Sequence, residues 1–322
     1  MTNSKKHHHY IPQFYINGFT NHKGEVFVLE HSTGKINKQS KYGTFHKYKF
    51  YTVDFSKHKE RDPESAQKIK KALGIENVDT SNVKKYPDMI EDLLGDSETV
   101  SAPIIKKLIE GKQISSTEKI ELSTFIALMY TKTPSFHNFA SEMEKQMMNK
   151  SIKKLFLEKE KVKDLYNKML AEGYEDKIDV QELFKLVEED RYKIEIPKEL
   201  TIQTMLIGTS VIDRILYNKT WLIMEAPSTT SFITNDQPVF MNHPLVNKYG
   251  PFSVGVGTSK VEIIFPLSKE LLLIMKDTPK GNMIMHKKID RTKVRDLNKL
   301  IFARSGDYVI ARDFALIKKL MK

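Results

Sequence analysis

The first 61 residues alternate apolar and polar positions between turn-forming residues. This period of two predicts strands. Pro12 favours the first position of a helix, because its fixed backbone angle suits a helix start. The predicted elements are a helix at Gln13–Phe19, a hairpin over Gly24–Gln39 with its turn at His31–Gly34, and a strand at Tyr48–Val53.

From residue 62 to residue 217 the apolar positions recur every three or four residues, which predicts helices. In Ser116–Thr131 a capping sequence precedes apolar residues at helical spacing. Pro134 is expected to break the chain after this helix. The other predicted helices are Glu64–Leu73, Ser81–Leu94, Glu98–Glu110, Phe136–Ala171 in one or two pieces, Gln181–Glu189 and Leu200–Tyr217.

Short apolar runs return after Lys219 and again predict strands. They are Thr220–Glu225, Ser231–Thr234, Val261–Phe265 and Glu270–Met275, followed by a helix at Lys293–Arg304, a strand at Asp307–Ile310 and a helix at Asp313–Leu320. This order is typical of an α+β protein. We expect a mixed or antiparallel sheet from segments 1–61 and 218–322, packed together as one composite domain around the helical block 62–217.

Composition narrows the chemistry more than it narrows the fold. The chain has no cysteine, which excludes disulfides and thiolate metal sites. Its 52 Lys and Arg against 41 Asp and Glu give a net charge of +11. Such a charge favours nucleic acid or another anionic partner, and it also arises from codon bias toward lysine. No apolar run approaches the roughly 18 residues of a membrane span and no apolar leader is present, so we expect a cytoplasmic protein.

Three consecutive histidines, His7, His8 and His9, are the most informative feature of the chain. Imidazole titrates near neutrality and is a common metal ligand. A purification tag and an ordinary solvated terminus are the alternatives to a functional site. The histidines precede the predicted helix start at Pro12, where backbone N–H groups favour an anion.

Three further polar positions stand in apolar or turn-rich surroundings. Asp236 follows a predicted strand in Thr234–Pro238, a place typical both of functional carboxylates and of Asx turns. Asn298 lies between two leucines, as a structural hydrogen bonder or a substrate contact. Glu98 heads a predicted helix, where a carboxylate also complements the helix dipole.

Nucleotide-binding glycine loops, the zinc-protease motif and the serine-hydrolase elbow are all absent from the sequence. On an extended strand His7 and His9 share one face, because side chains alternate between faces. Together with Asp236, they are the candidate ligands of a divalent metal, while the cofactor itself stays unknown.

The motifs resemble a bacterial family called domain of unknown function 4238. The resemblance begins with His8-His9-Tyr10-x-Pro12-Gln13-Phe14-Tyr15 and extends over most of the chain. Lys132 departs from it, because the family usually has Arg before x-Pro. The resemblance implies an intracellular bacterial or phage-associated protein with no established reaction. Its further segments are Phe50-Tyr51-Thr52, Glu98 with the following helix, Thr131–Pro134, Phe232–Pro238, Phe265–Ser268 and Asn298.

Two principal hypotheses follow. The first is a hydrolase, such as a nuclease, that cleaves a phosphodiester or related nucleotide bond, with a role in phage defence as an extension. In this hypothesis His8, His9 and Asp236 are catalytic, and Gln13, Tyr51, Glu98 and Asn298 bind substrate. The second is a non-enzymatic module that binds nucleic acid or protein through a basic helical block. A metabolic enzyme acting on a small anionic substrate is a third explanation of the histidines.

Overall fold

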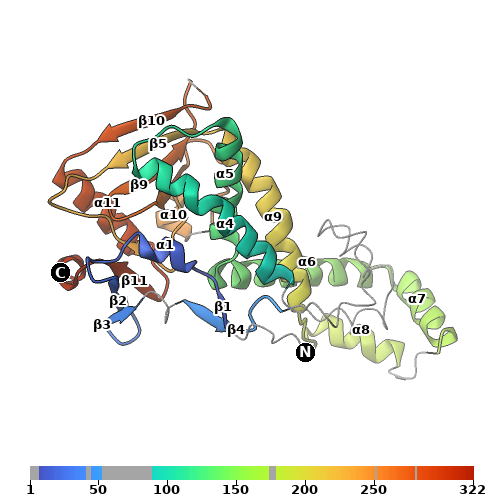
Figure 1. The fold of residues 1–322 in the computed structure, drawn as a ribbon. Helices are drawn as coiled ribbons and strands as arrows, with labels where there is room; N and C mark the ends of the chain where they lie inside the picture. The colour runs from blue at the N-terminus through green and yellow to red at the C-terminus, as the bar shows by residue number, and fades with distance from the viewer. Residues whose placement is uncertain (1–6, 41–44, 53–88, 174–178, 251, 280) are drawn as a thin grey trace, which may run out of the picture. The chain divides into compact units, whose positions relative to one another are not determined.

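A computed structural model describes residues 7–40, 45–52, 89–173, 179–250, 252–279 and 281–322 (Figure 1). The predicted helix Glu64–Leu73 and most of Ser81–Leu94 lie outside these residues. The chain forms two compact units: Met1–His137 with Ile202–Lys322, and Asn138–Thr201. The fold class is α+β with a central helical block, as the sequence predicts.

The largest sheet of the first unit has five strands in the order β10-β5-β9-β8-β7. Its central strand, β9, is apolar without alternation, because residues 271–275 are all buried. Strands β10 and β5 are parallel and the other pairs are antiparallel. The strands are β5 (Thr220–Glu225), β7 (Phe240–Asn242), β8 (Glu262–Pro266), β9 (Leu271–Lys276) and β10 (Ile284–Lys288).

A second, antiparallel sheet joins the two ends of the chain in the order β3-β2-β11-β6. The predicted hairpin is confirmed as β2 and β3, and β2 pairs with β11. The strands of the N- and C-terminal segments are therefore distributed over separate sheets and do not form the one sheet that the sequence predicts. The bounds are β2 (Glu25–Glu30), β3 (Lys35–Ser40), β6 (Thr234–Asn235) and β11 (Tyr308–Ala311).

A small ribbon of two strands carries the histidines. Strand β1 (His7–His9) pairs antiparallel with β4 (His46–Tyr48), so that His9 lies opposite His46. The predicted strand Tyr48–Val53 is wrong for residues 49–51, which form a turn after β4. Strand β1 was not predicted, because three identical residues contain no alternation to recognise.

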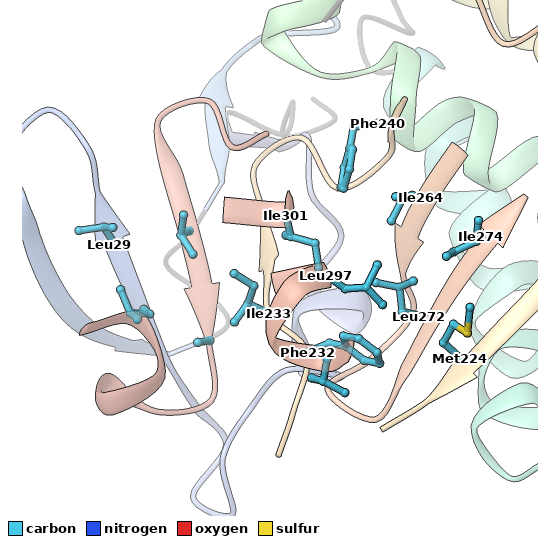
Figure 2. Packing of buried hydrophobic residues seen from close by; sticks show 14 residues of the cluster. Leu29, Met224, Phe232, Ile233, Phe240, Ile264, Leu272, Ile274, Leu297 and Ile301 are labelled. Carbon is cyan, nitrogen blue, oxygen red and sulfur yellow. The ribbon is translucent and has the colours of Figure 1, made fainter. Parts of the chain in front are cut away.

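Helix α11 (Arg291–Ala303) supplies the core between the two larger sheets. Figure 2 shows its Leu297 and Ile301 lying between Leu29 of β2 and Leu272 of β9. The predicted strand Ser231–Thr234 is shorter than expected, because Asn298 of α11 takes the place of a strand partner. Its side chain bonds to the main chain of Ser231 and Ile233.

Helices α4 (Met89–Ile109) and α5 (Ser116–Thr131) pack against each other in the first unit. Helix α5 begins with the predicted capping box, formed by Ser115 and Glu118. Residues 95–97, which separate two predicted helices, are helical in α4, so the predicted helix start at Glu98 is wrong. Two short helices of the C-terminal segment are α10 (Pro244–Tyr249) and α12 (Phe314–Leu320).

The second unit is helical. Its elements are the later part of α6 (Pro134–Phe156), α7 (Lys159–Ala171), α8 (Val180–Glu188) and the beginning of α9 (Lys198–Asn218). Helix α6 begins at Pro134, where a chain break is predicted, and the long charged segment is divided into α6 and α7. Phe156 and Phe184 form a ring contact at 5.7 Å in its core.

Candidate functional site

The β1–β4 ribbon sends neighbouring histidines in opposite directions, because side chains of a strand alternate. The His8 side chain is completely buried, whereas His9 is half-buried. The main-chain N–H of Tyr10 donates to the carbonyl of Phe45 at 3.0 Å and extends the ribbon. The side chain of His7 lies outside what the structure describes.

Helix α1 (Gln13–Asn17) follows the ribbon directly and is fixed to the large sheet. The Tyr15 ring stacks on Phe265 of β8 at 5.3 Å, and its hydroxyl donates to the carbonyl of Pro266 at 2.8 Å. Phe14 contacts Phe125 of α5 at 5.5 Å between ring centres. These contacts hold Gln13 at a defined place beside His9.

A pocket of about 550 Å³ lies between β1, α1 and α4. The side-chain nitrogen of Gln13 lies 3.3 Å from Nε2 of His9, so that Gln13 donates to the neutral imidazole. Glu91 and Glu98 line the same pocket, and their spacing of seven places them on one face of α4. Other lining residues are Phe14, Gly95, Thr99 and Ala102.

An ion pair holds Glu98 at the pocket. Lys132 donates from Nζ to Oε1 of Glu98 at 2.8 Å, and only 1% of the lysine side chain is exposed against 25% of the glutamate. Glu98 lies in the middle of α4, so it does not complement a helix start. The position at which the sequence departs from the resembled family therefore forms part of the site.

Tyr51 and His8 support the pocket from the interior. The Tyr51 main-chain N–H donates to Nδ1 of His8 at 2.9 Å, and the two rings stack at 5.8 Å. The Tyr51 hydroxyl donates to the carbonyl of Lys132 at 2.6 Å. Burial, with smaller effects of Glu91 and Glu98, raises the pKa of Tyr51 well above its usual value. Tyr51 is therefore a protonated donor at neutral pH.

Asp236 is bound to the main chain. Its two carboxylate oxygens accept hydrogen bonds from the N–H groups of Gly306 at 2.9 Å and Asp307 at 2.8 Å. Burial raises the pKa of Asp236, and these N–H groups oppose the shift. Gly306 is required for this approach, because a Cβ there would lie 2.8 Å from one Asp236 oxygen.

The side chain of Asn298 is likewise hydrogen-bonded to the main chain. Its Oδ1 accepts from the N–H of Ile233 at 3.1 Å, and its Nδ2 donates to the carbonyl of Ser231 at 2.8 Å. Only 1% of this residue is exposed. We infer that Asp236 and Asn298 stabilise the fold, since their polar atoms are engaged with the main chain.

The structure thus brings together some of the predicted residues. His9, Gln13 and Glu98 line one pocket, and His8 and Tyr51 lie next to it. Asp236 and Asn298 do not line this pocket. Among the described residues, no group of three or more His, Asp or Glu is placed to hold a metal. The proposed ligand set of His7, His9 and Asp236 is therefore not assembled among the described side chains.

Two residues of the pocket were missed. Glu91 would have been found from its spacing of seven to Glu98 if one continuous helix had been predicted there. Lys132 was singled out in the sequence only as a departure from the resembled family, and its place at the pocket was missed because only tertiary packing buries it against Glu98.

The outer part of the ribbon is basic and aromatic. Tyr48 is 64% exposed, and Nζ of Lys49 lies 5.5 Å from its ring centre. Lys47 is similarly placed over the ring of Phe50 at 5.5 Å. His46 contacts His9 edge-on at 5.6 Å, which connects this surface to the pocket. Lysines beside exposed aromatic rings suit phosphates and bases.

The positive charge is not located in the helical block. Segments 1–61 and 218–322 contain 11 and 17 Lys and Arg against 4 and 9 Asp and Glu. The block 62–217 contains 24 against 28, a net charge of −4. The expectation of a basic helical block is therefore wrong, because its many lysines are outnumbered by carboxylates.

Fold and pocket together define an α+β protein with a polar pocket beside a basic ribbon. The chain belongs to the family described as "Protein of unknown function (DUF4238)", whose profile matches residues 7–314. Comparison with curated proteins and with solved structures finds no match. None of the helices in the described part of the chain has the length and hydrophobicity that a membrane crossing requires.

Proposed function

We propose that this protein is a hydrolase that cleaves a bond of a nucleotide or nucleic acid in the His9 pocket. The observation that carries the proposal is the convergence of His9, Gln13 and Glu98, which come from three separate elements, on one pocket of about 550 Å³. Sites that combine a hollow with several convergent polar groups are typical of ligand binding. Imidazole is the most frequent general base of enzymes.

His9 takes the proton in this proposal. In the structure the single lone pair of Nε2 faces the Gln13 amide nitrogen. The Gln13 amide must therefore turn away first, after which Nε2 takes a proton from the attacking water and the Gln13 oxygen can accept from the imidazolium. Lys132 holds Glu98 in place at the pocket through the 2.8 Å ion pair. His8 and Tyr51 hold the two walls of the pocket together.

The ribbon supplies substrate binding. Lys47 and Lys49 are placed to contact phosphates, and Tyr48 offers an exposed ring on which a base can stack. The excess of positive charge in residues 1–61 would attract a polyanion to this side of the site.

The charge of the pocket indicates which kind of nucleotide bond is the better substrate. Among the described residues, the charged side chains that line it are Glu91 and Glu98, and Lys132 reaches it through its ion pair with Glu98. A phosphodiester would meet like charge there and would require a divalent cation. Cleavage of an N-glycosidic bond builds positive charge on the sugar, which carboxylates stabilise. The lining therefore favours the N-glycosidic bond over the phosphodiester.

The test is product analysis after incubation of single-stranded DNA, single-stranded RNA and mononucleotides with the full chain. Free base released in the presence of EDTA identifies N-glycosidic cleavage, whereas shorter fragments that need Mg²⁺ or Mn²⁺ identify a nuclease. His9→Ala should lower either rate at least about 100-fold. The matched control is His31→Ala, because His31 is exposed, does not line the pocket, and has its Nε2 2.7 Å from the Ser305 hydroxyl. Equal rates in both variants would refute the proposal.

A non-enzymatic module that binds nucleic acid is the second candidate, and the exposed ribbon is the observation that favours it. Salt-sensitive binding of oligonucleotides that needs Lys47 and Lys49 but is accompanied by no cleavage would support it. Phage defence by a cytoplasmic protein is the cellular extension of the first proposal. It predicts that bacteria carrying His9→Ala lose protection that the wild-type chain gives in a plaque assay.

A further inference from the structure

A second pocket, of about 320 Å³, lies where the beginning of α5 meets the end of α9 and strand β10. Its lining differs in charge from that of the His9 pocket. Lys112, Lys119 and His286 are among the lining residues, and no Asp or Glu of the described part of the chain is. Gln113, Tyr217 and Asn282 add neutral polar groups. The volume suits a small molecule rather than a macromolecule.

Lys119 is the unusual residue of this pocket. Only 3% of it is exposed, which is rare for a lysine without a carboxylate partner. Its Nζ donates to the carbonyl of Lys219 at 3.1 Å and to Oδ1 of Asn282. The ammonium also lies 5.0 Å from the ring centre of Trp221 and 5.4 Å from that of Tyr217. An ammonium has three donors, so one remains for a ligand.

The other buried lysines show what Lys119 lacks. Lys132 is paired with Glu98 at 2.8 Å, and Lys219 is paired with Asp277 at 2.9 Å. Within the described part of the chain, no ion pair involves Lys119. Burial lowers the pKa of Lys119 to about 8, so the group is still mainly charged at neutral pH. No described Asp or Glu supplies its counter-charge.

We propose that this pocket binds the phosphate or carboxylate group of a small molecule, which pairs with Lys119. Lys112, which pairs with Glu110 at 2.6 Å, and His286 stand at the exposed part of the pocket and provide further hydrogen-bond donors. The apolar side chains of Leu108, Ile114 and Ile284 accommodate the uncharged remainder of the ligand. This site is separate from the His9 pocket, with which it shares no lining residue.

The first experiment is isothermal titration of the full chain with inorganic phosphate and, separately, with acetate, at constant ionic strength set by chloride. We expect one equivalent of one of these anions to bind, and the arm that gives heat identifies the ligand group. Lys119→Met should abolish this binding. Absence of saturable binding of both anions to the wild-type chain at millimolar concentration would overturn the proposal.

Substitutions of two exposed lysines, Lys106 and Lys112, test the proposal without changing the buried Lys119. Lys106 and Lys112 both pair with Glu110, but only Lys112 lines the pocket. Lys112→Ala should weaken anion binding roughly two- to fivefold, while Lys106→Ala leaves it unchanged. The double variant Lys112→Ala with His286→Ala changes only exposed residues, so it decides the question even where Lys119→Met fails to fold. Wild-type affinity in the double variant would contradict the proposal.

Discussion

Two polar clusters of similar appearance in the sequence have different surroundings in the structure. In the described part of the chain, the side chains of Asp236 and Asn298 hydrogen-bond to main-chain groups. Around His9, side chains bond to other side chains, as in the pairs His9–Gln13 and Lys132–Glu98, and they line a pocket. Polar groups saturated by main chain hold a fold together, whereas those that converge on a hollow can meet a ligand.

The largest expected effect concerns Asn298. Asn298→Leu leaves the Ile233 N–H and the Ser231 carbonyl buried without partners, so we expect a loss of about 3 kcal/mol in the free energy of unfolding. Equilibrium unfolding in urea measures it. The control is Asn218→Leu, because Asn218 is exposed and bonds only within its own helix. Unchanged stability together with lost activity would show that Asn298 contacts substrate.

Gly306 tests the same cluster from the other side. In Gly306→Ala the new Cβ would collide with the Gln237 side chain and lie 2.8 Å from a carboxylate oxygen of Asp236, so these groups or the loop must shift and stability falls by about 2 kcal/mol. Gly255→Ala is the matched control, because a Cβ there meets nothing within 4 Å. The melting temperatures of the two variants should differ clearly. Equal values would mean that Asp236 does not need its main-chain partners.

Glu98→Gln tests the ion pair of the His9 pocket. Lys132 then keeps a buried charge without its carboxylate, and we expect a loss of about 1.5 kcal/mol, reduced by the partial exposure of Glu98. The surface pair Lys145–Glu142 serves as control, since Glu142→Gln should change stability by less than about 0.5 kcal/mol. Urea unfolding of both variants gives the comparison. If Glu98→Gln were as stable as Glu142→Gln, the ion pair of Lys132 with Glu98 would not stabilise the site.

Gln13→Leu sharpens the assignment of His9. The change keeps the approximate size of the side chain and removes the amide that orients the imidazole, so hydrolysis should fall about tenfold. Stability should change little, because Gln13 is only half-buried. Initial rates at saturating substrate measure the effect. If hydrolysis in Gln13→Leu fell as far as in His9→Ala, Gln13 would act directly in the reaction.

The smallest expected effect is a pH dependence. Since the folded-state pKa of Asp236 is raised, the folded chain holds this proton more tightly than the unfolded chain. The stabilising contribution is therefore full below about pH 4, the usual range of Asp, and it declines as the pH rises through the raised pKa. The stability of the wild type relative to Asp236→Asn should fall over that interval in unfolding experiments. If the stability of the wild type relative to Asp236→Asn rose with pH, the folded-state pKa of Asp236 would be lowered and not raised.

Local patterns predicted the parts of the fold that depend on local sequence. The hairpin of β2 and β3, strand β9 and the capped start of α5 were recognisable from alternation, apolar runs and capping residues. Strand β10 was not, because nearly all its residues are exposed and no alternation marks it. The continuity of α4 across Gly95 was also missed, because glycine is unfavourable inside a helix and indicated a break there.

The candidate site was predictable only in its members near the N-terminus. His9 and Gln13 lie four residues apart, so their contact is nearly local. The approach of Glu98 depends on α4, on α5 and on the buried Lys132, which no local pattern specifies. The hydrogen bonds of Asn298 likewise could not be predicted, because they join it to residues 231 and 233, which lie more than sixty positions away in the sequence.

The most direct test of the comparison measures activity and stability together for His9→Ala and Asn298→Leu. The account predicts opposite results: His9→Ala keeps its free energy of unfolding and loses hydrolysis, whereas Asn298→Leu loses stability and keeps the hydrolytic rate of each folded molecule. Hydrolysis that survives in His9→Ala, or that disappears from folded Asn298→Leu, would contradict the assignment of function to one cluster and of structure to the other.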